Sequence, residues 1–167
     1  HWEKAPPDRP IVIAGSTGSI AATRALMRAV SHLPRGVIVL PGLDIDLDAE
    51  AWGMVKDQHP QFTLKETLGA LGIERDAVRL LGDEDAHARS RRVLMREALA
   101  PAEQTADWLA RLQKAGGADF VAAGAQGLRL IEAATEDEEA ASIAVLLRET
   151  LEIAGRTAAL ATPDANL

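Results

Sequence analysis

Two short apolar runs flank an amphipathic stretch near the start of the chain. Residues 11–15 and 37–40 are apolar and rich in Ile and Val, and each run is closed by glycine or by Pro-Gly. Short β-branched runs bounded in this way are typical of buried strands. Between them, residues 21–32 have helical spacing, and Ser19 is placed to cap that helix. The pattern predicts a parallel strand–helix–strand unit, which in turn favours a three-layer α/β core.

A second strand–helix–strand pattern follows at the end of the chain. Residues 128–133 and 157–162 have strand-like composition, and residues 136–153 form an amphipathic stretch whose first turn is acidic. Between the two units, helices are predicted over residues 64–71, 86–99 and 103–115. Thr63 and Gly72 are expected to cap the first of these helices, and Gly116-Gly117 is the best candidate for a domain boundary.

Composition narrows the classes of function. The chain has 167 residues, a formal net charge of −7, 3% aromatic residues and no cysteine. Without cysteine it has no disulfides, thiolate zinc sites or iron–sulfur ligands. Proteins that bind duplex DNA alone are usually basic, so a net charge of −7 makes independent DNA binding unexpected. The proline-rich residues 1–10 are predicted to be a linker, and we expect the chain to be a piece of a longer protein.

The sharpest local motif is the glycine–serine turn between the first strand and the first helix. It comprises Gly15, Ser16, Thr17, Gly18 and Ser19, and Asp44 follows the next strand. A Rossmann fold places a pyrophosphate at such a helix N-terminus and keeps an acid for the ribose. Alanines stand where the third glycine of that motif belongs, so turn geometry alone also explains the run. The chain contains no Gly-Lys pair, and therefore no Walker A loop.

Two other sets of residues suggest a site, and each has a structural explanation. Asp44, Asp46, Asp48 and Glu50 alternate as in a calcium loop, but Ala49 stands where such a loop needs glycine. His59 precedes a proline and has no catalytic partner at triad-like spacing. We therefore predict no metal site and no catalytic residue in this chain.

Basic residues concentrate in one predicted helix. Arg89, Arg91, Arg92 and Arg96 lie within residues 86–99 and are candidates for contacts with DNA phosphates. The alternative, which the sequence favours, is a solvated helix face that pairs with nearby acids. Those acids are Asp83, Glu84, Asp85 and Glu97.

Four segments, taken together and in order, resemble the AddB family, the nuclease-bearing subunits of AddAB-type helicase–nucleases. The segments are IVIAGSTGSIAATRALMRAVSHLPRGVIVLPGLD, HPQFTLKETLGALGIERDAV, REALAPAEQTADW and GLRLIEAATEDEEAASIAVLLRETLEIAGRTAALATPD. The resemblance covers nearly the whole chain. It implies a RecC-like, inactivated region of a superfamily-one helicase, with a P-loop-NTPase (RecA-like) fold.

The resemblance also implies that this chain lacks the acidic residues with which related helicases hydrolyse ATP. Active helicases of that superfamily end the first strand in an Asp-Glu pair, which holds Mg²⁺ and orients water for ATP hydrolysis. Here that strand ends in Ala14-Gly15, and the second strand is followed by Pro41-Gly42-Leu43-Asp44 in place of a Gly-Asp sensor motif. These departures imply a helicase-like scaffold without ATPase function.

From the resemblance we expect residues 11–115 to be the end of a first helicase-like domain with a helical insertion, and residues 116–167 the start of a second. The expected function is that of a non-catalytic scaffold in DNA double-strand-break repair by homologous recombination. The resemblance implies a cytoplasmic complex with an AddA-like subunit, which uses ATP, and with DNA. It also implies Mg²⁺ and an iron–sulfur cluster elsewhere in the parent protein, but no cofactor here.

Two alternatives stay open. One is a Rossmann-type NAD(P)-binding domain of an oxidoreductase that uses the residues of the glycine–serine turn and Asp44. The other is a small α/β interaction module.

Overall fold

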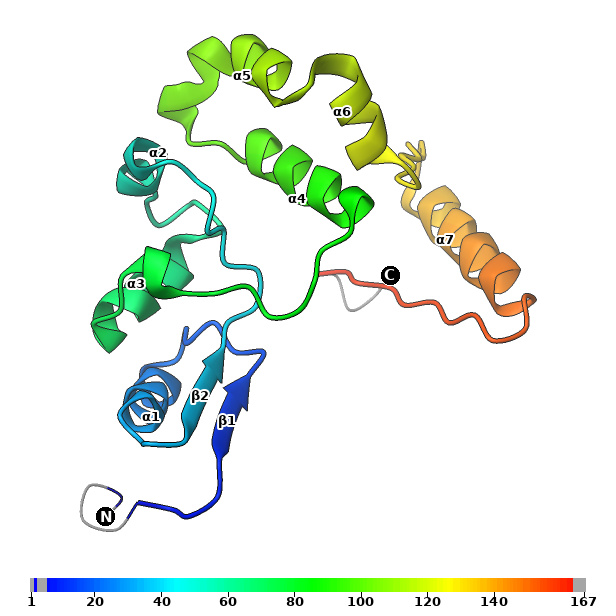
Figure 1. The fold of residues 1–167 in the computed structure, drawn as a ribbon. Coiled ribbons are helices and arrows are strands. Elements are labelled where there is room, and N and C mark those ends of the chain that lie inside the picture. The colour runs from blue at the N-terminus through cyan, green and yellow to red at the C-terminus, as the bar shows by residue number, and fades with distance from the viewer. Residues whose placement is uncertain (1, 3–5, 164–167) are drawn as a thin grey trace. The chain divides into compact units, whose positions relative to one another are not determined.

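The computed structural model describes residue 2 and residues 6–163, and these divide into two compact units. Unit 1 ends at Gln126 and unit 2 begins at Gly127. The fold is mixed α/β and mostly helical, and the described residues contain a single parallel sheet of two strands (Figure 1). None of the described helices is long and apolar enough to cross a membrane.

Unit 1 opens with the strand–helix–strand pattern that the sequence predicts. Strand β1 (Ile11–Ala14) and strand β2 (Gly36–Val39) pair in parallel, and helix α1 (Ala21–Ser31) connects them. Helix α1 contacts both strands and buries Met27 and Val30. The predicted pairing is therefore confirmed, although the predicted cap is wrong. The N-cap residue of α1 is Ile20, not Ser19, and no side chain caps the helix there.

Among the described residues, a helix covers one face of the sheet and none covers the other. Val12 and Val37 are register partners, so they project from the same face, and their exposed fractions are 57% and 48%. Strand runs that are apolar on both faces are typical of sheets covered on both sides. The third layer that we predicted is thus absent from the described residues.

Two short helices follow the sheet and carry part of the core. Helix α2 (Ala49–Met54) was not predicted, and it contributes Ala51 to a cluster with Leu47 and Val55. Asp48 caps its N-terminus by accepting a hydrogen bond from the Ala51 amide at 2.7 Å. Helix α3 (Phe62–Leu71) is confirmed and ends at Gly72 with φ of 68°, whereas its N-cap is Gln61 and not Thr63.

The rest of unit 1 is a group of helices. Helix α4 (Ala86–Ala98) and helix α5 (Trp108–Ala115) match two predicted helices, with η1 (Arg75–Ala77) before α4 and η2 (Ala102–Asp107) between α4 and α5. Helix α6 (Gly117–Ala125) was not predicted, and it packs against α4. Because of that packing, the boundary between the units lies after Gln126 and not at Gly116-Gly117.

Unit 2 contains one helix between two extended segments. Helix α7 (Glu136–Leu151) is capped by Thr135, whose hydroxyl accepts a hydrogen bond from the Glu138 amide at 3.2 Å. The Glu138 carboxylate in turn accepts from the amide of Ala134, the residue before the N-cap, at 3.0 Å, so two side chains bind main-chain amides at this helix start. The predicted strands 128–133 and 157–162 are not strands in the structure, and residues 127–163 include no buried side chain. A strand needs a neighbouring strand for its main-chain groups, and the described residues of unit 2 include no strand.

Candidate functional site: the glycine–serine turn and the arginine cluster

The glycine–serine turn packs against helix α3 and is hydrogen-bonded to it. The Thr67 hydroxyl is fully buried and donates a hydrogen bond to the Thr17 carbonyl at 2.7 Å. Gly18 packs against the same threonine so closely that a Cβ atom at Gly18 would lie 2.6 Å from Thr67 Oγ1. Gly18 is therefore required by this contact and by its φ of 72°.

The turn's own polar groups also satisfy one another. The Gly18 amide donates to the Ser16 hydroxyl at 3.2 Å, and Arg24 Nε donates to the Gly18 carbonyl at 2.9 Å. One amide that a phosphate-binding loop offers to its ligand is thus already occupied by a side chain of the turn.

Asp44 turns the chain toward helix α2. Its carboxylate accepts hydrogen bonds from the amides of Asp46 and Leu47, both at 3.0 Å. The Asp44 amide donates to Gln61 Oε1 at 3.0 Å, and Arg75 Nη1 donates to the Asp44 carbonyl at 3.3 Å. Both amides bind Oδ1 of Asp44, so this carboxylate holds a turn, and a role for it in binding a ribose stays a prediction.

Two other acids of that segment also have hydrogen-bond partners. Asp48 caps α2, and Asp46 accepts a hydrogen bond from Arg92. In the part of the chain that the structure describes, no three His, Cys, Asp or Glu side chains are grouped closely enough to hold a metal ion. Nearby, Nδ1 of His59 accepts a hydrogen bond from the Gln61 amide at 3.1 Å, which gives this histidine a role in the turn.

The end of strand β1 carries no acidic side chain. Ala14 is the last residue of the strand, and the Gly15 amide donates to the Val39 carbonyl at 3.2 Å. Gly15 has φ of 79°, and a Cβ atom there would meet nothing within 4 Å. This position has a methyl group and a hydrogen atom, and it therefore offers no ligand to Mg²⁺.

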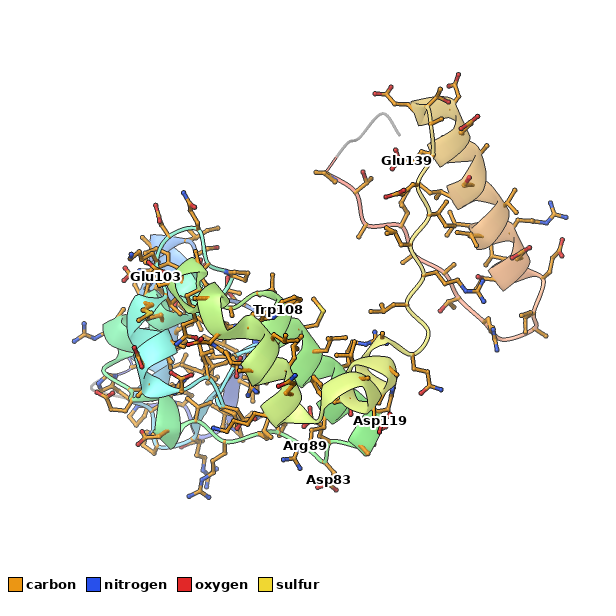
Figure 2. All side chains as sticks on the ribbon, turned by 90° about the horizontal axis from the view of Figure 1, so that it is seen from above. Asp83, Arg89, Glu103, Trp108, Asp119 and Glu139 are labelled. Atoms are coloured by element: carbon orange, nitrogen blue, oxygen red, sulfur yellow. The ribbon has the colours of Figure 1, made fainter. Side chains whose placement is uncertain are left out.

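The four arginines of helix α4 differ in their surroundings. Arg89 is exposed and points away from the helices (Figure 2). Arg91 donates to the carbonyls of Gly124 and Gln126 at the end of α6. Arg92 binds the Glu84 carboxylate with two donors, at 2.8 and 2.9 Å, and also binds Asp46. Arg96 pairs with Glu97 at 3.0 Å.

Two of the acids named from the sequence are thus partners of these arginines. They are Glu84 and Glu97. The pairing does not form the solvated face that we expected, because Glu97 is buried and Arg92 and Arg96 are only partly exposed. A third, Asp85, accepts from the Ala88 amide at 2.7 Å and caps α4. Whether any of these arginines contacts DNA stays a prediction.

The Arg92–Glu84 pair shifts the titration of both groups. The hydrogen bond from Arg92 holds the pKa of the Glu84 carboxyl below its ordinary value of 4.5. The hydrogen bond to Glu84, supported by Asp46, raises the pKa of Arg92 above its ordinary value. Both groups therefore stay charged throughout the neutral range.

A buried carboxylate organises the junction of α4, η2 and α5. Glu97 is 4% exposed, and it accepts from Arg96 and from Arg111 Nε, the latter at 2.9 Å. Arg111 also donates to Gln104, and Trp108 Nε1 donates to the Glu97 carbonyl at 3.0 Å. The sequence predicted a pairing of Glu97 with the arginine cluster, but it did not reveal Arg111 or Trp108, which lie 11 to 14 residues away along the chain.

A groove of about 600 Å³ lies beside this junction. Its walls carry acids such as Glu50 and Asp107 together with Arg96, Arg111 and Lys114. The buried polar atoms of the described side chains all have hydrogen-bond partners, so none of them awaits a ligand there.

Comparison with known proteins does not assign the chain to a family or these residues to a function. No family model, no curated protein and no solved structure matches the chain.

Proposed function

We propose that this chain is a non-catalytic, helicase-like scaffold region of an AddB-type subunit, which acts in DNA double-strand-break repair. In this proposal an AddA-like subunit uses ATP, and the chain supports the DNA path without hydrolysing nucleotide. The proposal starts from the four segments that resemble AddB, and it extends to a three-layer, RecA-like core that includes β1, α1 and β2.

The observation that carries the proposal is the end of strand β1. A nucleotide-hydrolysing motor needs carboxylates for Mg²⁺ and a loop that cradles phosphates. Here the strand ends in Ala14-Gly15, and the following turn is held by Thr67 and Arg24. The parallel β1–α1–β2 unit has no carboxylate at the end of β1, which supports a scaffold that does not hydrolyse nucleotide.

The open face of the sheet supports the same proposal. Val12 and Val37 lie side by side and exposed on the face opposite α1. Burying an apolar side chain of this size stabilises a protein by about 1.5–3 kcal/mol. A second helix layer, supplied by other parts of a larger subunit, would cover this face.

The contacts of the arginine cluster favour a scaffold over an independent DNA-binding module. Arg91 and Arg92 bind other parts of the chain, and Arg96 pairs with its neighbour Glu97 on α4. Arg89 is the arginine of this set that projects into solvent. The net charge of −7 opposes association with phosphate backbones. We expect DNA affinity to come from the assembled complex.

One set of binding and turnover measurements tests this function. The purified chain is assayed for ATP hydrolysis with Mg²⁺ and single-stranded DNA, and its melting temperature is measured with millimolar NADPH. We expect no turnover and no shift. ATP turnover would contradict the scaffold, and an NADPH-dependent rise in melting temperature would favour the dinucleotide-binding alternative.

A second experiment tests the assembly. The chain is co-expressed with an AddA-like subunit, and the mixture is separated by size exclusion. We expect the two to elute together, and the gene that encodes the chain to continue into a nuclease domain with four cysteines. Separate elution, together with a gene that lacks this domain, would refute the proposal.

A further inference from the structure

Helices α4 and α6 approach each other with almost no space between their backbones. Gly124 of α6 is buried, and a Cβ atom there would lie 2.8 Å from the Ser90 carbonyl and 2.9 Å from Leu94 Cβ. Only glycine allows this contact without displacing α4. The last turn of α6 is therefore fixed in position next to Arg91.

Arg91 binds the end of α6 with two separate donors. Nε donates to the Gly124 carbonyl, and Nη2 donates to the Gln126 carbonyl. Carbonyl groups in the last turn of a helix have no partner within the helix, and a cation there also interacts favourably with the helix dipole. A guanidinium group can bridge two such carbonyls because its donors are rigidly spaced, which a lysine ammonium cannot reproduce.

The chain changes character directly after this contact. Gln126 is the C-cap of α6 and the last residue of unit 1, and Gly127 follows with φ of 79°. Residues 128–133 form neither helix nor strand, and Leu130 is 86% exposed. Arg91 thus acts on the last helical turn before the non-helical segment that opens unit 2.

We propose that Arg91 is a clasp that sets the length of the link between helices α6 and α7. While Arg91 holds the two carbonyls, α6 stays wound to Ala125 and the link begins at Gly127. When the clasp opens, the last turn of α6 unwinds, and the link gains the residues of that turn. Arg91 is a positioning residue in this account, and the account does not depend on the proposed function.

Hydrogen exchange on the full chain tests the clasp. The conservative variant Arg91→Lys keeps the charge and loses the bridge, and Arg89→Lys is the matched control because Arg89 lies exposed on the same helix. We expect the amides of residues 122–126 to exchange roughly tenfold faster in Arg91→Lys, which corresponds to the loss of one charge-assisted hydrogen bond. Exchange in Arg89→Lys and in the β1–β2 sheet should stay unchanged.

Trypsin cleavage after Arg129 provides a second measurement. We expect Arg91→Lys to be cut several-fold faster there than the wild type or Arg89→Lys, because an unwound α6 end leaves more chain free for the protease. Equal exchange in all three proteins would overturn the clasp. So would an equal acceleration across β1, β2 and α6, which would show a general loss of stability and no local opening.

Discussion

Glu97 shows how a single buried charge ties together elements that are distant in the sequence. Its carboxylate lies between Arg96 and Arg111, and its carbonyl accepts from Trp108. Removing one partner of a buried ion pair leaves the other charges without compensation, and this costs more than the pair itself contributes.

We expect Glu97→Gln to lower the free energy of unfolding by about 2–4 kcal/mol, because two guanidinium groups lose their counter-ion. Urea denaturation measures the change. Glu66→Gln is the control, since Glu66 lies exposed on α3, and its effect should stay within about 0.5 kcal/mol. Equal effects of the two variants would show that Glu97 contributes nothing specific.

The Glu84–Arg92 pair gives a prediction about pH. The hydrogen bond from Arg92 lowers the folded-state pKa of Glu84 below its ordinary value of 4.5. The pair therefore stabilises the fold fully above about pH 4.5, and this stabilisation is lost as the pH falls through the lower, folded-state pKa. We expect an NMR titration of the Glu84 carboxyl to have its midpoint below 4.5 in the wild type.

The variant Arg92→Gln supplies the comparison for that titration. It removes the donor that lowers the pKa, so the midpoint of Glu84 should rise toward 4.5. An unchanged midpoint would mean that Arg92 is not the cause of the shift.

At the scale of elements, the two glycines of the turn after β1 separate the cost of a left-handed backbone from the cost of a steric clash. Both have positive φ, but only Gly18 packs against Thr67, whereas Gly15 has open space around its Cα. Alanine at either position carries the cost of a left-handed backbone, about 1–2 kcal/mol. At Gly18 the clash with a buried threonine adds to that cost.

We expect Gly18→Ala to be more destabilising than Gly15→Ala by about 1–3 kcal/mol, which is the typical cost of overpacking. Thermal or urea denaturation of the two variants measures the difference. Equal losses of stability would show that the turn moves away from α3 at no cost, and that Thr67 does not hold it.

The sequence predicted the elements whose pattern is local. The strands at 11–15 and 37–40 and the helices near 21–32, 64–71, 86–99 and 136–153 all exist within a few residues of their predicted limits. Helix α2 was missed because its six residues include Gly53 and follow an alternating acidic segment. Helix α6 was missed because Gly116 and Gly117, which stand at its N-cap and first position, favour a linker.

Predictions that depend on partners far away in the sequence were less accurate. Residues 128–133 and 157–162 have strand-like composition, but strand formation also requires a neighbouring strand, which no local pattern can guarantee. The same limit applies to the site. The sequence indicated that the arginines of α4 pair with acids, but it could not show that Arg91 binds carbonyls of α6 or that Arg111 reaches Glu97.

At the scale of the whole molecule, the two units differ in how they are stabilised. Unit 1 has buried apolar side chains, including Met27 and Leu64, whereas the described part of unit 2 has no buried residue. Hydrophobic burial is the main term that offsets the entropy of ordering a chain, so the stability of unit 2 should be far lower.

We expect the amides of residues 128–133 and 157–161 to exchange with solvent at least about a hundredfold faster than those of α1 and α3, because local opening free energies range from near zero to the full stability of the core. Hydrogen exchange followed by mass spectrometry of the full chain measures both regions. Protection of these segments as strong as that of α1 would show that they form a stable sheet in solution.

The sheet of unit 1 also provides a surface for self-association of the chain. Each outer edge of the β1–β2 ladder presents main-chain donors and acceptors with which a strand of another molecule can pair. The exposed side chains of Val12 and Val37 add an apolar surface beside these edges. At low ionic strength the charge of −7 keeps copies apart, but added salt weakens that repulsion. Solutions of the isolated chain should therefore scatter more light as the concentration of sodium chloride is raised, and Val12→Lys should suppress this increase in scattering.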